Sequence, residues 1–381
     1  APPAADTADP MPPLKIALIS DCYHPRLGGI ELQVRDLGDR LAAAGHTVEV
    51  ITPVPGDDVV EGRRVHRLDV PLLPFDLAYR RDTFTKIRDL VVAGGFDVAH
   101  FHSGVISPSS YGGTYEVQRA GVPTVVTSHC IWGYATPLFA QAERRWRWSS
   151  WPVVYSAVSE VAAGDIRRAT ADRREVLVLP NGIDEEAWAV DPLPRDPDVV
   201  TITSTMRLAP RKRPRPLIPM IAALRERTRP GTRLQVVIIG DGPQREKIAG
   251  LISRHRLDDV VTLTGTLERD QIRDWLARTD IYVAPANLES FGIAALEARC
   301  AGGPVVAKSC TGIREFVEHG REGYLCDTDA EMVVNLAHLV NHPEVREAMA
   351  IHNRTTAPAC NWDDVVKRNL AAYEDAAPLP G

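Results

Sequence analysis

The 381-residue chain contains no apolar run that approaches the about 20 residues of a membrane-spanning helix. It also has no Cys-x-x-Cys pair. Its six cysteines are scattered, as is typical of reduced structural thiols in a cytoplasmic protein. Basic charge is not in excess, because 44 Lys and Arg stand against 50 Asp and Glu, so we expect no general nucleic-acid binding. A Gly-x-Gly-x-x-Gly fingerprint is missing, which argues against an NAD-linked oxidoreductase.

Length and periodicity predict two α/β domains. A chain this long exceeds the usual single core, and buried strands alternate with helical segments from Leu14 onward, which favours parallel sheets. A Pro- and Asp-rich linker, residues 191–198, separates two such halves. We therefore predict a disordered N-terminal extension over 1–13, which lacks a signal-peptide pattern. The remaining segments are a first domain over 14–190, a second over 199–355, and a closing helical segment over 356–381.

The most informative segment is the one that Glu289 and Glu297 frame. A buried strand from Ile281 runs into a turn, and an Ala- and Leu-rich helix follows, for which Ser290 is a plausible N-cap. Free amides and the helix dipole at such a helix start can bind phosphate. The flanking carboxylates can accept hydrogen bonds from sugar hydroxyls. Helical glutamates usually only face solvent, but this combination suits a nucleotide-sugar.

At this point the chain resembles the retaining glycosyltransferases of family GT4, whose hallmark is this Glu-x7-Glu element. The resemblance covers roughly residues 14–375, and its motifs recur in order. They are Gly28-Gly29, His100 and His102, Thr127-Ser-His129, Ser159-Glu160, Asn181 with Asp184, Arg207, Lys212, Gly240-Asp-Gly-Pro, Gly265, and the Glu pair. It implies the GT-B fold, in which two Rossmann-like parallel-sheet domains face a central cleft, with a last helix that returns to the first domain.

The resemblance also implies roles for these residues. Glu289 would hold hydroxyls of the reacting sugar and Glu297 those of the ribose. The backbone of Ser290, Phe291, Gly292 and Ile293 would bind phosphate, His129 would orient the sugar, and Gly28 and Gly29 would form a donor-contacting loop. The family needs no metal and no cofactor beyond its nucleoside diphosphate sugar, and a front-side displacement would retain the anomeric configuration.

Arg207 and Lys212 follow the first strand of the second half and would neutralise a departing diphosphate. Family members commonly carry Gly before this Arg and after this Lys, where this chain has Met206 and Arg213. Arg211 and Arg213 therefore compete with Lys212 for the role. A basic run is otherwise usually a solvated face.

Histidines and paired aspartates are the other candidates for chemistry. His100 and His102 alternate with Phe101 and so share a strand face, where we expect them to act as supporting groups because no third metal ligand is evident. Asp196-x-Asp198 and Asp327-x-Asp329 match a metal signature of another glycosyltransferase fold. Each lies in a linker or turn, so turn chemistry is the simpler interpretation.

Two segments bear on the acceptor. Leu73 to Val91 scans as a helix on which Leu77, Phe84, Ile87 and Val91 share a face with Arg80, Arg81 and Arg88. It is either an interfacial helix that meets anionic lipid, giving peripheral membrane attachment, or an internal helix. The segment from Arg144 to Trp151 offers the same choice between anchoring and packing.

The stretch from His102 to Tyr134 resembles the subunit that adds GlcNAc to phosphatidylinositol, which favours a lipid or inositol-like acceptor. We thus expect a hexosyltransferase that uses a UDP- or GDP-linked sugar. The alternatives are a non-catalytic nucleotide-sugar-binding scaffold and a GT-B phosphorylase, whose pyridoxal phosphate lysine has no clear candidate here.

Overall fold

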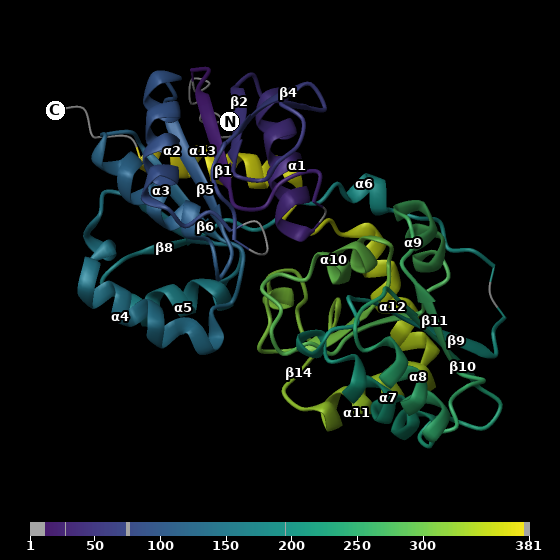
Figure 1. Cartoon of the computed structure of the whole chain (residues 1–381). Helices are drawn as coiled ribbons and strands as arrows, with labels where there is room; N and C mark the ends of the chain where they lie inside the picture. Colours follow the sequence, from purple (N-terminus) through teal and green to yellow (C-terminus); the bar gives the residue numbers. More distant parts are fainter. Residues whose placement is uncertain (1–11, 27, 74–76, 195, 377–381) are drawn as a thin grey trace, which may run out of the picture. The chain divides into compact units, whose positions relative to one another are not determined.

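The computed structural model describes residues 12–26, 28–73, 77–194 and 196–376, which form two sheets with flanking helices (Figure 1). The predicted extension over 1–13 lies outside the described residues except for its last two positions. Two compact units make up the chain. One contains residues 1–127, 150–155 and 368–381, and the other contains 128–149 and 156–367.

The first sheet has eight strands in the order β3-β4-β2-β1-β5-β6-β7-β8. They are β1 (Lys15–Ser20), β2 (Thr47–Thr52), β3 (Val59–Val60), β4 (Arg63–Arg67), β5 (Val98–Ser103), β6 (Thr124–Ser128), β7 (Val154–Ala157) and β8 (Val176–Val178). β1 pairs in parallel with β2 and β5, as the predicted strands require, whereas the short β3 pairs antiparallel with β4.

Helices connect these strands, and the same region also contains single-turn 3-10 segments. The helices are α1 (Gly29–Ala43), α2 (Arg81–Ala93), α3 (Pro108–Arg119), α4 (Thr136–Trp146), α5 (Glu160–Thr170) and α6 (Glu185–Trp188); the 3-10 turns are η1 (Gly133–Ala135) and η2 (Trp148–Ser150). Helix α1 begins at Gly29, so Gly29 is helical and only Gly28 precedes it.

The second sheet is entirely parallel, with the order β11-β10-β9-β12-β13-β14. Its strands are β9 (Val199–Thr205), β10 (Arg233–Ile239), β11 (Val261–Gly265), β12 (Ile281–Ala284), β13 (Val305–Lys308) and β14 (Gly323–Cys326). The helical segments are η3 (Pro210–Lys212), α7 (Pro214–Arg225), α8 (Arg245–Arg254), α9 (Arg269–Leu276), α10 (Ile293–Cys300), η4 (Gly312–Glu315), α11 (Asp329–Asn341), α12 (Pro343–Thr355) and α13 (Trp362–Ala376).

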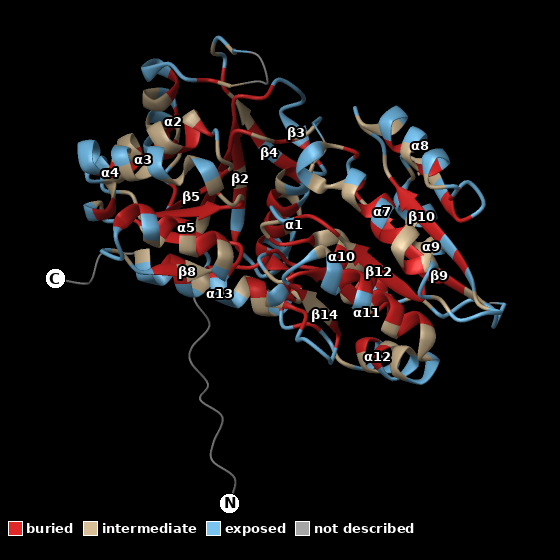
Figure 2. Ribbon diagram, turned by 90° about the horizontal axis from the view of Figure 1, so that it is seen from below, coloured by how far each residue is buried: buried red, intermediate tan, exposed pale blue. Residues whose placement is uncertain are grey.

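Both faces of the second sheet are covered, and its strands are accordingly buried along most of their length (Figure 2). Val283 and Val306 point to a core formed with α7, α8 and α11, while their neighbours Tyr282 and Val305 point to the opposite core, formed with α10. This alternation is the period of two that a strand dictates. The fold is therefore the predicted pair of parallel α/β sheets.

The last helix completes the first unit. Residues 368–376 of α13 belong to that unit, and the buried Tyr373 hydroxyl lies 2.9 Å from Nδ1 of His100 on β5. Nε2 of His100 lies 2.7 Å from the Thr127 hydroxyl, and the rings of His100 and His102 are 4.1 Å apart. Both histidines are buried, so they hold β5, β6 and the closing helix together.

The structure corrects the helix predicted over Leu73 to Val91. Residues 74–76 lie outside the described residues, Leu73 and Leu77 form an antiparallel bridge, and α2 begins only at Arg81. Its apolar stripe is internal, because Ile87 and Val91 have no exposed surface.

The arginines of this segment are largely paired. Arg88 lies 2.7 Å from Asp89 and 3.3 Å from Glu116 on α3, and Arg80 lies 3.3 Å from Asp82, while Arg81 is exposed. The apolar stripe of α2 is therefore not a membrane-facing surface.

Candidate active site

The strand order of the second sheet defines where a ligand should bind. From β9 the chain proceeds outward to β10 and β11 on one side, and then returns to β12, β13 and β14 on the other. The carboxyl ends of β9 and β12 thus flank the topological switch point, where open α/β sheets bind their ligands. The predicted Arg207 and Lys212 follow β9, and the predicted Glu289 follows β12.

Lys212 and Glu289 join the two loops at this switch point. The Lys212 ammonium donates to Oε2 of Glu289, and the side chains remain 23% and 20% exposed, respectively. An anion can therefore approach the ammonium while a hydroxyl approaches the carboxylate. Arg207, which precedes η3 in the same loop, is exposed. A cation pair and a carboxylate consequently share one edge of the sheet.

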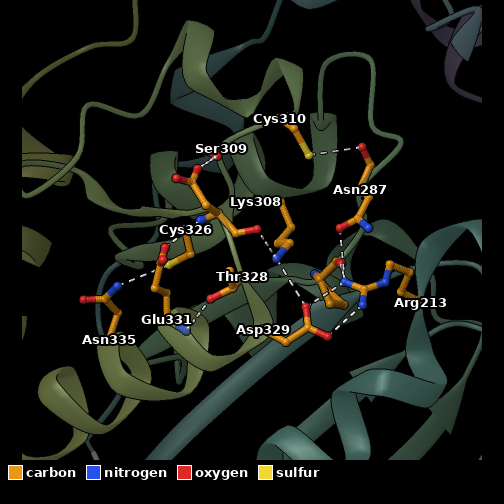
Figure 3. Close-up of polar contacts among 12 residues, drawn as sticks. Arg213, Asn287, Lys308, Ser309, Cys310, Cys326, Thr328, Asp329, Glu331 and Asn335 are labelled. Carbon is orange, nitrogen blue, oxygen red and sulfur yellow. Dashed lines mark hydrogen bonds and ion pairs between the residues drawn. The ribbon is translucent and has the colours of Figure 1, made fainter.

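Arg213, one of the two other candidates for the role of Lys212, makes a different set of contacts (Figure 3). Its guanidinium forms a bidentate ion pair with Asp329 at the start of α11, with distances of 2.9 and 2.7 Å. It also donates to the Pro285 carbonyl at 3.0 Å and to Oδ1 of Asn287 at 3.1 Å, in the loop that leads to Glu289. Arg213 thereby ties the loop after β9 to the loop after β12.

Lys308 completes this cluster. Its Nζ, on the nearly inaccessible end of β13, donates to the Asp327 carbonyl at 2.9 Å and lies 3.3 Å from Asp329. Hydrogen bonding from Arg213, followed by that from Lys308, holds the pKa of Asp329 below its usual range despite partial burial. The Asp329 carboxylate is thus ionised at neutral pH. It follows β14 and links Arg213, in the loop after β9, to Lys308 at the end of β13.

Arg213 has a left-handed backbone conformation, with φ of 57°. This conformation costs a residue with a side chain roughly 1 kcal/mol or more and is one that glycine adopts freely. It explains the glycine that related enzymes place after the lysine. In this chain the contacts of the guanidinium offset the cost. Arg211 is exposed and makes none of these contacts, so Lys212 is the best-placed phosphate ligand of the three.

The Gly240-Asp-Gly-Pro loop supports Arg207, a function that the sequence did not indicate. Met206 and Leu208 donate backbone hydrogen bonds to Ile239 and Asp241, both at 2.9 Å. A Cβ atom on Gly240 would lie 2.1 Å from the Met206 carbonyl oxygen, and one on Gly242 would lie 2.7 Å from that of Leu208. The loop therefore packs directly beneath the backbone that carries Arg207.

The helix after Glu289 begins later than predicted. Gly292, not Ser290, is the N-cap of α10, and it has a φ of 96°. A Cβ on Gly292 would lie 2.5 Å from Cγ1 of Ile313, so both backbone and space require glycine. Glu297 consequently lies about one turn into the helix. The amides of Ile293 and Ala294 precede the first hydrogen bonds of the helix, which the Ala295 and Leu296 amides donate to the Gly292 carbonyl at 2.9 and 3.0 Å.

Phe291 and the loop after β13 fix this turn. Phe291 is buried against Phe316, with ring centroids 5.5 Å apart. The Gly312 amide donates to the Glu289 carbonyl at 2.9 Å, and a Cβ on Gly312 would overlap the Ser290 carbonyl at 2.0 Å. The backbone from Glu289 to Gly292 is therefore held on two sides.

Tyr282 on β12 and Glu297 on α10 lie in the two elements that flank the loop carrying Glu289. Burial raises the pKa of Glu297 to about 8, and Arg269 opposes the shift. The Tyr282 hydroxyl accepts from the Thr205 amide at 3.1 Å, which fixes the end of β9 against β12. Burial also raises the pKa of Tyr282, and the nearby carboxylates of Glu297 and Glu289 add to this shift. Because its pKa is about 8, Glu297 is mostly protonated at neutral pH.

His129 follows β6, belongs to the same compact unit as Glu289 and Glu297, and is 8% exposed. Burial lowers its pKa to about 4, and a hydrogen bond with Asn181 partly opposes the shift. The imidazole is therefore neutral at physiological pH and acts as a hydrogen-bonding group rather than as an acid.

Gly28 and Gly29 belong to the other compact unit, at the start of α1. A Cβ on Gly28 would lie 2.5 Å from Oε2 of the buried Glu31.

The loop that ends at Gly28 also contains Asp21, which the sequence analysis missed. Its carboxylate accepts the amides of Ser109 and Ser110 at 3.1 Å each, and so caps α3.

The two Asp-x-Asp pairs bind protein groups, but the predicted turn chemistry fits Asp196 and Asp198 better than Asp329, which forms a long-range ion pair. Oδ1 of Asp196 accepts the Asp198 amide at 3.0 Å, and Asp327 and Asp329 bind Ser309 and Arg213. Within the described residues, no helix is long and apolar enough to cross a membrane.

Two family models match adjacent parts of the chain: Glycosyltransferase Family 4 over residues 27–187 and Glycosyl transferases group 1 over residues 189–356. Solved structures share the fold. A cyanobacterial protein, Anabaena Alr3699/HepE in complex with UDP and glucose, has a TM-score of 0.73 at 17% identity, with 95% of this chain and 99% of that one covered. Sucrose-phosphate synthase from Thermosynechococcus elongatus has a TM-score of 0.72 at 22% identity, with 95% and 98% covered.

Relatives with curated functions match along most of the chain. The phosphatidylinositol N-acetylglucosaminyltransferase gpi3 subunit of Schizosaccharomyces pombe is 26% identical, with 94% of this chain and 80% of that protein covered. The GDP-mannose-dependent alpha-mannosyltransferase of Mycolicibacterium smegmatis is 26% identical, with 95% and 97% covered. The D-inositol 3-phosphate glycosyltransferase of Arthrobacter sp. is 28% identical, with 92% and 90% covered.

Two parallel α/β sheets with a switch-point site of this composition define a glycosyltransferase of the GT-B fold. The chain belongs to glycosyltransferase family 4.

Proposed function

We propose that the protein transfers a hexose from a nucleoside diphosphate sugar to a hydroxyl of an inositol-type acceptor, with retention of configuration and without a divalent metal. The observation that carries the proposal is the Lys212–Glu289 pair at the switch point between β9 and β12. It places a cation for phosphate beside a carboxylate for sugar hydroxyls.

The charges around this pair suit departure of a diphosphate. Arg207 and Lys212 would bind the two phosphates, and the first amides of α10 would donate to the phosphate oxygens. Negative charge develops on the leaving diphosphate, so these fixed donors stabilise the transition state more than the bound donor. Because the chain itself supplies the positive charge, we propose that no metal is needed and that the enzyme has no cofactor.

Glu289 and Glu297 would recognise hydroxyl groups rather than form a covalent intermediate. Glu289 is tied to Lys212, which favours its role in holding sugar hydroxyls, and Glu297, further along α10, would hold the ribose. We infer that the acceptor oxygen bonds to the anomeric carbon on the face from which the diphosphate departs. The acceptor proton would pass to the departing phosphate oxygen. His129, whose pKa is about 4, is a neutral imidazole at physiological pH and would orient the sugar by hydrogen bonding rather than act as a general acid.

The acceptor class is suggested by the relatives. One is named for action on phosphatidylinositol and another for D-inositol 3-phosphate, so an inositol ring bearing a phosphodiester or phosphate is the chemistry they share. Their donors differ, since one transfers N-acetylglucosamine and another uses GDP-mannose. We therefore leave the base and the hexose to direct measurement.

The test begins with a thermal-shift panel of UDP, GDP, ADP and their hexose conjugates, because a ligand of the native state raises its melting temperature. The nucleotide that shifts the protein is then supplied as its sugar, with inositol 3-phosphate or phosphatidylinositol as acceptor and with EDTA in a parallel reaction. We expect a product whose anomeric proton, by NMR, has the configuration of the donor, at an unchanged rate in EDTA.

Each part of the proposal can fail separately. Nucleotide binding without product from either acceptor would reject the inositol acceptor, and an inverted product would reject retention. Activity lost in EDTA and restored by Mg²⁺ would reject metal independence. No shift with any nucleotide would reject the donor site itself.

A further inference from the structure

Helix α4 and the turn before it are anchored to helix α5. Oδ2 of the buried Asp165 accepts the amides of Trp132 and Gly133 at 2.7 and 3.1 Å, and its Oδ1 accepts the Thr136 hydroxyl at 3.0 Å. Phe139 stacks on Trp132, with ring centroids 3.8 Å apart and an angle of 19°. These contacts fix the orientation of α4 before any partner arrives.

The end of the helix is anchored in the same way. Glu143 is buried and accepts both the amide and the hydroxyl of Ser149, at 2.9 and 2.6 Å. Arg173 approaches the same carboxylate at 3.3 Å. Glu143 is the only carboxylate between residues 131 and 151 in the sequence, and its charge is directed inward.

Large apolar side chains are exposed on α4 and on the turn that precedes it. Tyr134 is 97% exposed, Leu138 67% and Trp146 60%. Leu138 and Trp146 lie on α4 and, with Tyr134 in the preceding turn η1, make up the exposed α4 ridge. Large side chains of this kind rarely cluster on the surface of a soluble protein without a binding role.

The charge on this face is uniformly positive. Arg144 and Arg145 are exposed near the end of α4, and the Arg145 guanidinium lies 6.0 Å from the Trp146 ring centroid. This local excess contrasts with the formal net charge of −6 for the whole chain. An aromatic and aliphatic ridge flanked by arginines, with no outward carboxylate in the segment, is complementary to an anionic lipid surface.

We propose that this α4 surface, made of Tyr134, Leu138, Arg144, Arg145 and Trp146, docks the protein onto anionic membranes. Leu138 and Trp146 enter the boundary between headgroups and acyl chains, and the two arginines contact lipid phosphates. The attachment is reversible and weakened by salt. It replaces the α2 stripe as the membrane-facing element, because Ile87 and Val91 are buried whereas the α4 ridge is not.

The experiment is sedimentation of the full chain with phosphatidylcholine vesicles that contain phosphatidylserine. We expect the wild-type protein to pellet at low ionic strength and to be released as salt is raised. Each arginine near the surface contributes about a fivefold change in partition, so Arg144→Ser with Arg145→Ser should weaken binding about 30-fold. Leu138→Ser with Trp146→Ser should weaken it by roughly tenfold or more.

Matched variants control for general effects. Val334→Ser removes another exposed apolar side chain, on α11, and Arg227→Ser with Arg254→Ser removes two exposed arginines elsewhere. These variants should sediment like the wild type. Circular dichroism should show that every variant is folded, and nucleotide-induced thermal shifts should be equal in all, because none alters the site described above.

Three outcomes would overturn the proposal. In the first, the wild-type protein remains in the supernatant at low salt. In the second, the α4 variants sediment as the wild type does. Alternatively, the α4 substitutions would change the elution volume in gel filtration without changing vesicle binding, which would assign the surface to a second copy of the chain.

Discussion

Arg213 and Asp329 are 116 residues apart in the sequence and form a two-pronged ion pair beside the candidate active site. Their contact joins the start of α7 to the start of α11. Through Pro285 and Asn287, Arg213 also holds the loop that presents Glu289. We infer that Arg213 positions both members of the Lys212–Glu289 pair.

Substitution of Arg213 should consequently affect donor use more than folding. We expect Arg213→Ala to lower kcat/KM for the donor by about 10- to 100-fold, mostly through KM, because a small displacement of Lys212 weakens phosphate binding. Arg213→Lys should not rescue it, since lysine cannot form the fork. Arg215→Ala, an exposed arginine two residues later, is the control. Equal losses in kcat/KM for Arg213→Ala and Arg215→Ala would contradict the positioning role.

The Lys212–Glu289 pair should be functional rather than structural. Both side chains are partly exposed, so breaking the pair should cost only about 1 kcal/mol of stability or less. We expect Glu289→Gln and Lys212→Ala each to reduce kcat at least about 100-fold while the melting temperature changes little. Glu318→Gln, which breaks the exposed ion pair with Arg321, should leave kcat unchanged. Wild-type turnover by a folded Glu289→Gln protein would disprove the assignment.

The raised pKa of Glu297 predicts a pH dependence of donor binding. The ordinary value of 4.5 rises to about 8, so the folded protein holds a proton that the unfolded chain has lost, and this contribution to stability declines as pH rises from 4.5 to 8. Ribose hydroxyls donate to the ionised carboxylate, so binding should release a proton below pH 8. The dissociation constant should fall as pH rises toward 8 and then level off.

Isothermal titration with the nucleoside diphosphate across this pH range measures the effect. Glu297→Gln should bind more weakly, and its affinity should lack the Glu297-dependent slope, because an amide does not titrate. If wild type and Glu297→Gln show the same slope, the proton comes from the nucleotide or from another residue, and Glu297 does not contact the ribose.

Gly292 should be intolerant of any side chain. Gly292→Ala would force a left-handed φ of 96° on alanine and place its Cβ 2.5 Å from Ile313, so the start of α10 must shift. Gly320 has a similar φ of 86° with open space around it. Gly320→Ala should therefore cost about 1–2 kcal/mol from backbone strain alone. We expect a larger loss of stability for Gly292→Ala, together with weakened nucleotide binding. Equal urea midpoints for the two variants would show that the contact with Ile313 is unimportant.

Local pattern was sufficient to predict the central strands. Lys15–Ser20, Thr47–Thr52 and Ile281–Ala284 are continuous runs of mainly apolar and β-branched residues, and they are strands in the structure. The short β3 and β4 were missed because Val59–Val60 and Arg63–Arg67 are brief and partly polar. Their pairing depends on neighbours rather than on their own periodicity.

Errors arose where distant contacts decide the outcome. Ser290 has the composition of a helix cap, but Gly292 takes that position because Gly312 and Ile313 pack against the preceding turn. The role of Arg213 depends on Asp329, which no local motif connects to it. The amphipathic pattern of Leu73 to Val91 could not distinguish lipid from α3 as its partner, and α3 is the one observed.

The hydrogen bond between Tyr373 and His100 affects how the protein folds during translation. The first unit includes residues 368–376, which are synthesised long after the rest of that unit. The hydrogen-bonded contact between His100 and Tyr373 therefore cannot form until those residues have been translated. The unit that holds the six-stranded sheet ends at residue 367 and does not include Tyr373. We expect the amides of β5 and β6 to gain protection from hydrogen exchange only after α13 has been synthesised.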